Sequence, residues 1–357
     1  MGPVQTLADP VDAILLREAG APALGRGPVA VLEEQSGSIA RGLVALRPDT
    51  VVRVHVDSST DEQAFAEATA GLDAVCLMDD LGPELLAGVV LVVMRLPKGL
   101  AALDAAAEAV ARWADPSVVL LAGGRVKHMS RGMNDVLRHH FGAVRASLGA
   151  QKSRVLMASE PQRVEESRYP LSGSDSELGL EIRAYGGTFA GPSVDLGTRF
   201  LLSFADSFPP ETRRVVDLGC GTGLLAVSAA RRLPAAAVLA LDTSRAAVQS
   251  AAATAQANGV ADWVEVRRTH LMTGVPDRSV DLILCNPPFH RGNSRDSAVA
   301  FEMLAEAART LQAGGELWTV FNSHLPYLRT LRRLIGQTTV LGQNTGYTVT
   351  RSVQSGG

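Results

Sequence analysis

One segment of the sequence places an acidic residue before three glycines at alternate positions. Asp217 lies near the end of a β-branched run, and Gly219, Gly221 and Gly223 follow before an apolar stretch typical of a helix. A strand, turn and helix in this order bring backbone N–H groups and the helix N-terminus against a ligand. A dinucleotide fingerprint needs glycine at position 224, where the sequence has Leu224, so a nicotinamide dehydrogenase is disfavoured.

A second acid, Asp242, stands at the end of the next predicted strand. Its carboxylate can accept hydrogen bonds from both hydroxyls of a ribose. Asp217 can help to hold an ammonium group, directly or through water. The two acids together favour a nucleoside that carries a charged amino-acid tail.

In the segment DLILCNPPFH, a further apolar strand is followed directly by Asn286, two prolines and Phe289. Consecutive prolines remove backbone donors and fix φ, so the carbonyl of Pro287 points in one direction. Asn286 Oδ1 and this carbonyl can each accept one N–H of a planar amino group, while Phe289 stacks on the ring that carries it. Accepting both N–H bonds localises the nitrogen lone pair and aims it at an electrophilic methyl carbon.

The elements that position these residues form a pattern that occurs twice. Short β-branched runs alternate with Ala- and Leu-rich amphipathic stretches, which is typical of β–α units around a mostly parallel sheet. At about 150 residues per domain, the 357 residues predict two domains. We expect domains at 1–160 and 180–357, joined by a linker at 161–179 that is rich in Ser, Glu and Gly. Strands are predicted at 29–32, 51–56, 74–77, 89–94, 118–122, 144–148, 214–218, 238–241, 264–267, 282–285, 315–321, 338–341 and 347–351.

The composition excludes several classes of protein. Hydrophobic residues make up 46% and charged residues 20%, as in folded globular proteins. No apolar stretch approaches the ~20 residues of a membrane helix, and the N-terminus lacks a signal-peptide core, so a cytoplasmic protein is expected. Cys76, Cys220 and Cys285 form no CxxC pair, so we expect no disulfide framework and no metal site.

The positive charge is concentrated in one part of the chain. Residues 116–168 hold nine Lys or Arg against four Asp or Glu, a net charge of +5, whereas the whole chain has a net charge of −3. Such a stretch is typical either of a polyanion-binding surface or of a solvated helix face. Its candidate contact residues are Arg125, Lys127, Arg131 and Arg138.

The glycine turn and the Asn-Pro-Pro-Phe segment resemble those of class I S-adenosylmethionine-dependent methyltransferases that act on exocyclic or amide nitrogen. The segments GGTFAGPSVDLGTRFLLS, FNSHLPYLRTL and QNTGYTVTRS are similar to bacterial ribosomal RNA guanine-N2 methyltransferases. In the first half, VVLLAGGRVKHMSRGM, HFGAV and KSRVLMA resemble the first domain of that family. In that family a degenerate copy precedes the catalytic domain. Here the first half also lacks the glycine turn, and MRLPKGL occupies the corresponding strand end.

The resemblance implies an α/β fold with two tandem Rossmann-like methyltransferase-type domains, each a mostly parallel seven-stranded sheet flanked by helices. It assigns S-adenosylmethionine as cofactor, held by Asp217, Gly219, Gly221, Gly223 and Asp242, with Phe189, Asp195 and Thr198 at its methionine end. His270 stands where the family has Asp or Asn to bind the adenine amino group. Gly346 to Val349 replace a segment that is more basic in the family.

The expected reaction is direct in-line methyl transfer from the sulfonium to the N2 amino group of a guanine, catalysed by Asn286, Pro287 and Phe289. The expected partner is ribosomal RNA or a ribosomal subunit, bound by a monomer through its first domain. A paired guanine must be flipped out or already unpaired. Two alternatives stay open: transfer to adenine N6 or a protein glutamine amide, and a non-catalytic ribosome-assembly factor that binds the cofactor.

Overall fold

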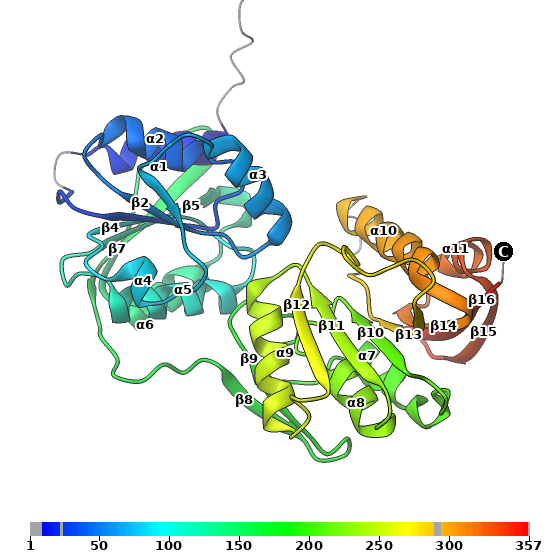
Figure 1. Cartoon of the computed structure of the whole chain (residues 1–357). Coiled ribbons are helices and arrows are strands. Elements are labelled where there is room, and N and C mark those ends of the chain that lie inside the picture. Colours follow the sequence, from blue (N-terminus) through cyan, green and yellow to red (C-terminus); the bar gives the residue numbers. More distant parts are fainter. Residues whose placement is uncertain (1–8, 22–23, 289–293, 356–357) are drawn as a thin grey trace, which may run out of the picture. The chain divides into compact units, whose positions relative to one another are not determined.

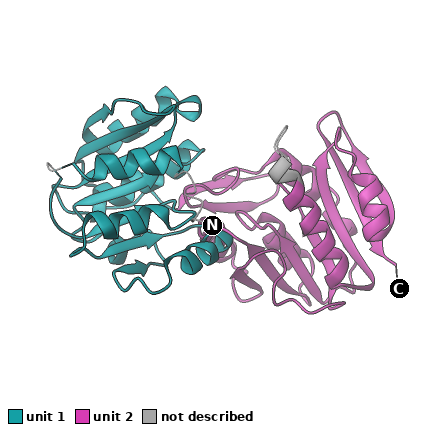
Figure 2. Ribbon diagram, turned by 90° about the horizontal axis from the view of Figure 1, so that it is seen from above, with its two compact units in different colours: residues 1–169 teal, residues 170–357 magenta. Residues whose placement is uncertain are grey.

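The computed structural model describes residues 9–21, 24–288 and 294–355. The chain divides into two compact units, Met1–Tyr169 and Pro170–Gly357 (Figure 2). The segment predicted as a linker, 161–179, is divided between them. Its first part follows the last strand of the first unit, and its second part contains a strand of the second unit.

The first unit is a seven-stranded sheet covered by helices on both faces (Figure 1). The first five strands in sheet order are parallel, and the sixth pairs antiparallel with both of its neighbours. In sheet order the strands are β3 (Val75–Leu77), β2 (Val52–His55), β1 (Val29–Leu32), β4 (Leu91–Arg95), β5 (Val119–Arg125), β7 (Ser153–Pro161) and β6 (Phe141–Ala146).

The helices of the first unit pack according to the alternation of side chains along the strands. One core joins Val29 and Val31 of β1 to α1 (Pro10–Ala19), α2 (Ser38–Leu46) and α3 (Ser59–Thr69). The other core joins Ala30 and Leu32 to α4 (Pro83–Leu86), α5 (Leu100–Trp113) and α6 (Arg131–His140). Both faces of the strand are therefore buried, which explains its continuous apolar sequence.

The second unit has the same strand order as the first. Its five parallel strands are likewise followed by a sixth strand that pairs antiparallel with both of its neighbours. In sheet order they are β12 (Val264–Arg268), β11 (Ala237–Asp242), β10 (Arg214–Leu218), β13 (Val280–Cys285), β14 (Leu311–Asn322), β16 (Tyr347–Gln354) and β15 (Gly336–Gln343). The predicted fold class, two tandem domains with mostly parallel seven-stranded sheets, is confirmed.

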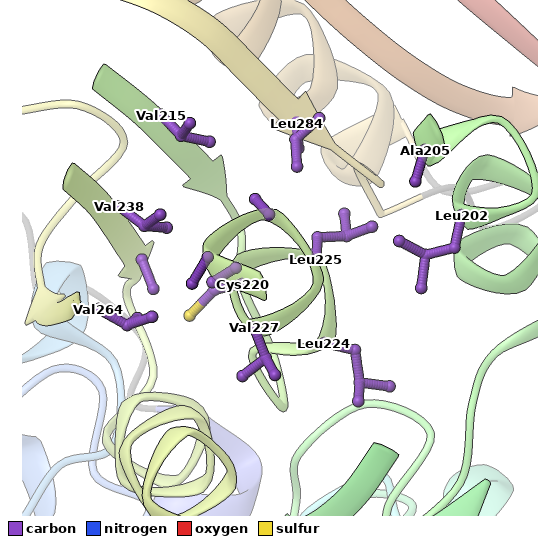
Figure 3. Close-up of a cluster of buried hydrophobic side chains, with 14 of the residues drawn as sticks. Leu202, Ala205, Val215, Cys220, Leu224, Leu225, Val227, Val238, Val264 and Leu284 are labelled. Atoms are coloured by element: carbon purple, nitrogen blue, oxygen red, sulfur yellow. The ribbon is translucent and has the colours of Figure 1, made fainter. Parts of the chain in front are cut away.

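Two helical layers also cover the sheet of the second unit. One core contains α7 (Leu196–Leu202), α8 (Leu224–Arg232) and α9 (Arg245–Ala257), and the other contains α10 (Ser294–Thr310) and α11 (Tyr327–Leu334). Figure 3 shows Val215, Val238 and Leu284, from three neighbouring strands, gathered around Leu225 at the start of α8. This core fixes the helix that follows the glycine turn.

Several elements were not predicted from the sequence. In the first unit these are α1, α4 and β7, and in the second the antiparallel hairpin of β8 (Leu171–Asp175) and β9 (Leu180–Ala184). β9 is held by side chains of α9: Thr254 Oγ1 accepts a bond from the Arg183 amide at 3.0 Å and donates to its carbonyl at 3.1 Å. A short strand held by helix side chains carries little periodic signal in its own sequence.

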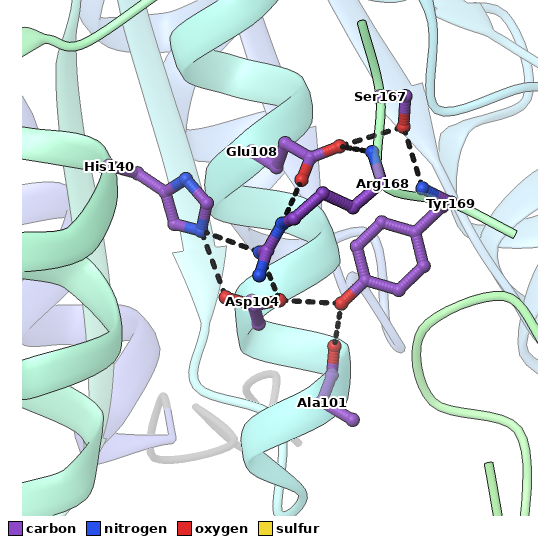
Figure 4. Close-up of polar contacts among 7 residues, drawn as sticks. All are labelled: Ala101, Asp104, Glu108, His140, Ser167, Arg168 and Tyr169. Atoms are coloured by element: carbon purple, nitrogen blue, oxygen red, sulfur yellow. Dashed lines mark hydrogen bonds and ion pairs between the residues drawn. The ribbon is translucent and has the colours of Figure 1, made fainter. Parts of the chain in front are cut away.

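The end of the first unit is anchored on α5 by a polar network (Figure 4). Arg168 donates to Glu108 Oε2 at 2.8 Å and to Asp104 Oδ2 at 2.6 Å. The hydroxyl of Tyr169 donates to Asp104 at 2.6 Å, and His140 Nε2 lies 2.9 Å from its other oxygen. Burial opposes ionisation of Asp104, but the hydrogen bonds from His140, Tyr169 and Arg168 lower its pKa overall. The segment around Arg168 is therefore held by the first unit.

Candidate functional site

The glycine turn adopts the backbone conformation that its sequence predicts. Gly219, Gly221 and Gly223 have φ values of 76°, 53° and 77°, all in the left-handed region that favours glycine. The amides of Gly219 and Cys220 both donate to the carbonyl of Leu241 at 2.9 Å. The turn that leaves β10 is thereby fixed against the end of β11.

The side chain of Asp242 completes this connection. It lies at the end of β11, where its Oδ2 accepts the Gly221 amide at 3.0 Å and its Oδ1 accepts the Ser244 amide at 3.0 Å. An ionised carboxylate can accept several hydrogen bonds, so this side chain suits the hydroxyls of a ribose. The geometry therefore fits the nucleoside contact expected from the sequence.

Asp217 is fully buried below the turn. Its Oδ2 accepts the Ala226 amide at 2.9 Å, while its Oδ1 has no hydrogen-bond partner among the residues that the structure describes. Burial, together with the charge of Asp242, raises the pKa of Asp217 to about 7. A buried acceptor without a hydrogen-bond partner costs free energy. A donor such as the ammonium of an amino acid would remove this cost at Asp217 Oδ1.

The glycine turn also leaves space for a ligand. A Cβ built at Gly221 meets no atom within 4 Å. This open side, which we call the cradle, lies beside the carboxylate of Asp242, and Asp217 is buried beneath the same turn. These residues fit S-adenosylmethionine, which has ribose hydroxyls and an ammonium group.

Asn286 follows β13, which pairs with β10. Its Nδ2 donates to Asp195 Oδ2 at 2.9 Å and to Thr198 Oγ1 at 3.0 Å. Oδ1, on the other side of the amide, accepts no hydrogen bond from the residues that the structure describes, so it can serve as the acceptor that the expected chemistry requires. Pro287 is buried, and Phe289 lies outside the described residues.

Asp195 and Thr198 were expected at the methionine end of the cofactor, and the structure shows their polar atoms facing the Asn286 amide. Asp195 caps the N-terminus of α7, where its Oδ2 accepts the amides of Gly197 at 2.9 Å and Thr198 at 3.0 Å. Tyr347, at the start of β16, lies over this turn, since a Cβ at Gly197 would be 3.2 Å from its ring. Burial and the charge of Asp195 raise the pKa of Tyr347.

Two other predicted cofactor residues, His270 and Phe189, make no side-chain hydrogen bond to Asn286, Asp195 or Thr198 in the described part of the chain. His270 lies just beyond β12, with an exposed side chain, and its carbonyl accepts the Thr273 amide at 3.1 Å. Phe189 lies in the loop between β9 and α7, and its side chain is 59% exposed. The preceding residue, Thr188, bonds to Ser250 of α9 at 2.9 Å, so the loop is fixed while Phe189 projects from it. Their assignments stay predictions.

The predicted RNA-contact residues lie in one part of the first unit. Arg125 ends β5 and donates to the Gln151 carbonyl at 3.3 Å. Lys127 lies in a 3₁₀ helix, Val126–His128, and Arg131 begins α6; both are exposed. Arg138 pairs with Asp135 at 3.1 Å, but both side chains are mostly exposed, so this pair contributes little to stability.

The described residues offer neither a membrane span nor a metal site. No helix in 9–21, 24–288 or 294–355 is long and apolar enough to cross a bilayer. Within the same ranges, no group of three or more His, Cys, Asp or Glu could hold a metal ion.

A parallel sheet with a glycine turn after β10, an acid at the end of β11 and Asn-Pro-Pro after β13 defines a class I methyltransferase, whose cofactor is S-adenosylmethionine. Two family models match the chain: the methyltransferase small domain over residues 179–351 and the RLMG N-terminal domain over residues 8–162. The chain belongs to the family of ribosomal RNA large subunit methyltransferase G, which confirms the resemblance inferred from the sequence motifs.

The relatives cover almost the whole chain. The ribosomal RNA large subunit methyltransferase G of Streptomyces avermitilis is 32% identical over 97% of this chain and 92% of its own length. That of Yersinia pestis is 30% identical over 96% of this chain and 87% of its own length. Among solved structures, the 16S rRNA N2 G1207 methyltransferase of T. thermophilus, in complex with AdoMet and guanosine, has a TM-score of 0.74 at 21% identity. It covers 98% of this chain and 93% of that chain, which shows a shared fold of both units.

Proposed function

We propose that this protein transfers the methyl group of S-adenosylmethionine to the exocyclic N2 amino group of a guanine in the RNA of the large ribosomal subunit. The observation that carries the proposal is the Asn286 amide, whose Nδ2 is held by two acceptors so that its Oδ1 is free for an amine. The large subunit is favoured because relatives with that name match over both units.

In this proposal the cofactor is held at the carboxyl ends of β10 and β11. Asp242 accepts the ribose hydroxyls, and the free oxygen of Asp217 accepts the ammonium. In the same proposal, the exposed side chains of Phe189 and His270 contact the methionine and adenine ends. When bound, the cofactor supplies an electrophilic methyl group on a sulfonium.

The residues of this chain act on the acceptor nitrogen. Asn286 Oδ1 and the Pro287 carbonyl accept its two N–H bonds, and Phe289 stacks on the base. Stacking is worth roughly 1–3 kcal/mol per base, which offsets part of the cost of unpairing the guanine. Methylation makes the nitrogen acidic, so its proton leaves to solvent without a dedicated base. Catalysis then comes mainly from proximity and orientation.

The first unit supplies the RNA contacts, through Arg125, Lys127, Arg131 and Arg138. Each unit has its own buried cores, so we also propose that the chain acts as a monomer, in the cytoplasm. With the large-subunit relatives named above, ribosomal RNA or the particle that contains it is the partner.

The direct test is methylation with a labelled methyl donor. Wild-type protein is incubated with separated large- and small-subunit RNAs and with the subunits themselves, and the nucleosides are then analysed. We expect labelled N2-methylguanosine in the large-subunit RNA. Labelled N6-methyladenosine, labelled protein or no label at all would contradict the proposal.

The first prediction concerns Asn286→Ala. Because the amide acts on the amine in the transition state, we expect turnover to fall at least ~100-fold, which corresponds to about 2.7 kcal/mol. S-adenosylmethionine affinity, measured by calorimetry, should stay unchanged. Gln337→Ala, an exposed amide on β15, is the matched control and should keep wild-type turnover. Near-normal turnover of Asn286→Ala would rule out its role.

A further inference from the structure

The orientation of the Asn286 amide decides whether the site can accept an amine. Rotation of the amide by 180° exchanges Oδ1 and Nδ2. In one orientation an acceptor faces the incoming N–H group, and in the other a donor opposes a donor. An amide held by nothing would be divided between the two, so the residues that hold it matter for turnover.

Two acceptors hold this amide. Asp195 Oδ2 and Thr198 Oγ1 lie 2.9 and 3.0 Å from Asn286 Nδ2. An ionised carboxylate can only accept, so Oδ1 of the amide is excluded from that position. Asp195 is in turn fixed by the amides of Gly197 and Thr198 at the start of α7. The N-terminus of α7 therefore fixes the Asp195 carboxylate, and this carboxylate fixes the orientation of the Asn286 amide.

The first unit repeats this arrangement with different chemistry. Asp9 caps α1 as Asp195 caps α7, and Asp12 follows Asp9 by three residues, as Thr198 follows Asp195. The residue at the end of the fourth parallel strand is Arg95, whose guanidinium pairs with Asp12 and lies 3.5 Å from Asp9. A guanidinium has no acceptor, so this copy cannot receive an amine.

The comparison shows that these three positions meet in both units although their side chains differ. In the first unit the helix end and the strand end close on each other by an ion pair. In the second unit the same positions leave one acceptor atom free. The two units therefore differ in the side chain at the strand end, which is a guanidinium in the first unit and an amide in the second.

We propose that Asp195 and Thr198 are positioning residues that keep Asn286 Oδ1 facing the acceptor amine. They do so by accepting both hydrogens of its amide nitrogen. This inference rests on the proposed function and deepens it, because it assigns to these two residues the selection of an amine acceptor. It also differs from a role at the methionine end of the cofactor, which would act on cofactor affinity.

A matched pair of substitutions at Thr198 tests the proposal. Thr198→Val keeps the shape but removes the acceptor, whereas Thr198→Ser keeps the hydroxyl. Since one hydrogen bond is at stake, we expect kcat of the valine variant to fall about tenfold, with kcat of the serine variant within about twofold of wild type. The dissociation constant of S-adenosylmethionine should stay unchanged in both variants, and thermal unfolding checks that they fold.

A second pair tests Asp195. Asparagine is also a good N-cap, so Asp195→Asn should keep α7 but can present a donor as well as an acceptor to Asn286. We expect kcat to fall several-fold, and the side-chain amide resonance of Asn286 to shift in NMR spectra of asparagine-labelled protein. Asp9→Asn, the equivalent change in the first unit, is the control and should leave both kcat and this resonance unchanged.

The outcomes separate the two proposals. Wild-type activity on large-subunit RNA decides the proposed function, and the variants decide the roles of the positioning residues. Equal kcat for the valine and serine variants would overturn the inference. So would a weakened S-adenosylmethionine affinity with unchanged kcat, because Thr198 would then serve the cofactor.

Discussion

At the scale of single residues, the proposed function depends on acceptors for which a ligand would supply the partners. Asp217 illustrates this, because one of its oxygens accepts the Ala226 amide while the other has no partner in the described chain. Its raised pKa, about 7, is the electrostatic result of that burial. In the proposed complex an ammonium at the unpartnered oxygen would favour the ionised form, which would couple cofactor binding to ionisation of Asp217.

A prediction about pH dependence follows from that coupling. S-adenosylmethionine affinity should rise about 5- to 10-fold from pH 6 to pH 7.5, because the ammonium binds the ionised carboxylate. Titration calorimetry measures this range, which lies below the titration of an α-amino group at about 7.7–8.0. Asp217→Asn should bind more weakly and lose the pH dependence, whereas the exposed Asp262→Asn should retain it. An affinity that does not vary with pH in the wild type would contradict the assignment.

The raised pKa of Asp217 also affects the stability of the cofactor-free protein, which should fall as pH rises, whereas cofactor affinity should increase. The pKa of Asp217 in the folded protein lies above the ordinary value of 3.8 for an aspartate, so its contribution to stability is fully present below pH 3.8. It is lost as pH rises through about 7. Bound cofactor should therefore stabilise the protein more at pH 7.5 than at pH 6.

At the scale of elements, the glycine turn distinguishes the two units. In the second unit it leaves an open side at Gly221. In the first unit the corresponding turn between β1 and α2 contains Glu34, whose carboxylate accepts the amides of Ser36, Ile39 and Ala40 at 3.1–3.2 Å. The helix N-terminus is thus satisfied by the chain itself. In the first unit, the Glu34 side chain therefore occupies the position that the glycine turn leaves open in the second unit.

The two glycines of the turn should respond differently to alanine. At Gly223 a Cβ would lie 2.9 Å from Ala251, and φ is +77°, so Gly223→Ala combines strain with overpacking. We expect its free energy of unfolding to fall by roughly 2–4 kcal/mol. At Gly221 only the strain applies, about 1–2 kcal/mol, but the methyl group enters the open cradle and should weaken S-adenosylmethionine binding. Denaturant unfolding and calorimetry measure the two effects, and equal stability losses would refute the packing argument.

At the scale of the whole molecule, the uneven charge is the main feature that a polyanion would recognise. The basic residues of the first unit lie at the end of β5 and on α6. In the second unit, α11 carries three further exposed arginines, Arg329, Arg332 and Arg333. Substitutions in the full chain can therefore test the contribution of each unit to RNA binding.

Replacing Arg125, Lys127, Arg131 and Arg138 with Gln should weaken RNA binding. Each lost phosphate contact flattens the plot of log affinity against log salt by ~0.7 for single strands or ~0.9 for a duplex, so the slope should fall by up to ~3. S-adenosylmethionine affinity should not change. The triple Gln variant of the α11 arginines is the comparison, and a flattened slope in that variant alone would place docking on the second unit.

The sequence by itself determined the alternation of the parallel strands with most of their helices, and the identity of the residues at three strand ends. This was possible because glycine turns, consecutive prolines and apolar runs are local signals, and parallel strands bring their carboxyl ends to one edge of a sheet. Only the tertiary structure decided that Asp195 and Thr198 hold the Asn286 amide, since these contacts join residues 91 and 88 positions apart. The same applies to β9, which is held by α9 across 71 residues. Contacts between distant segments leave no periodic pattern in the sequence, so the packing of the chain alone brings these side chains together.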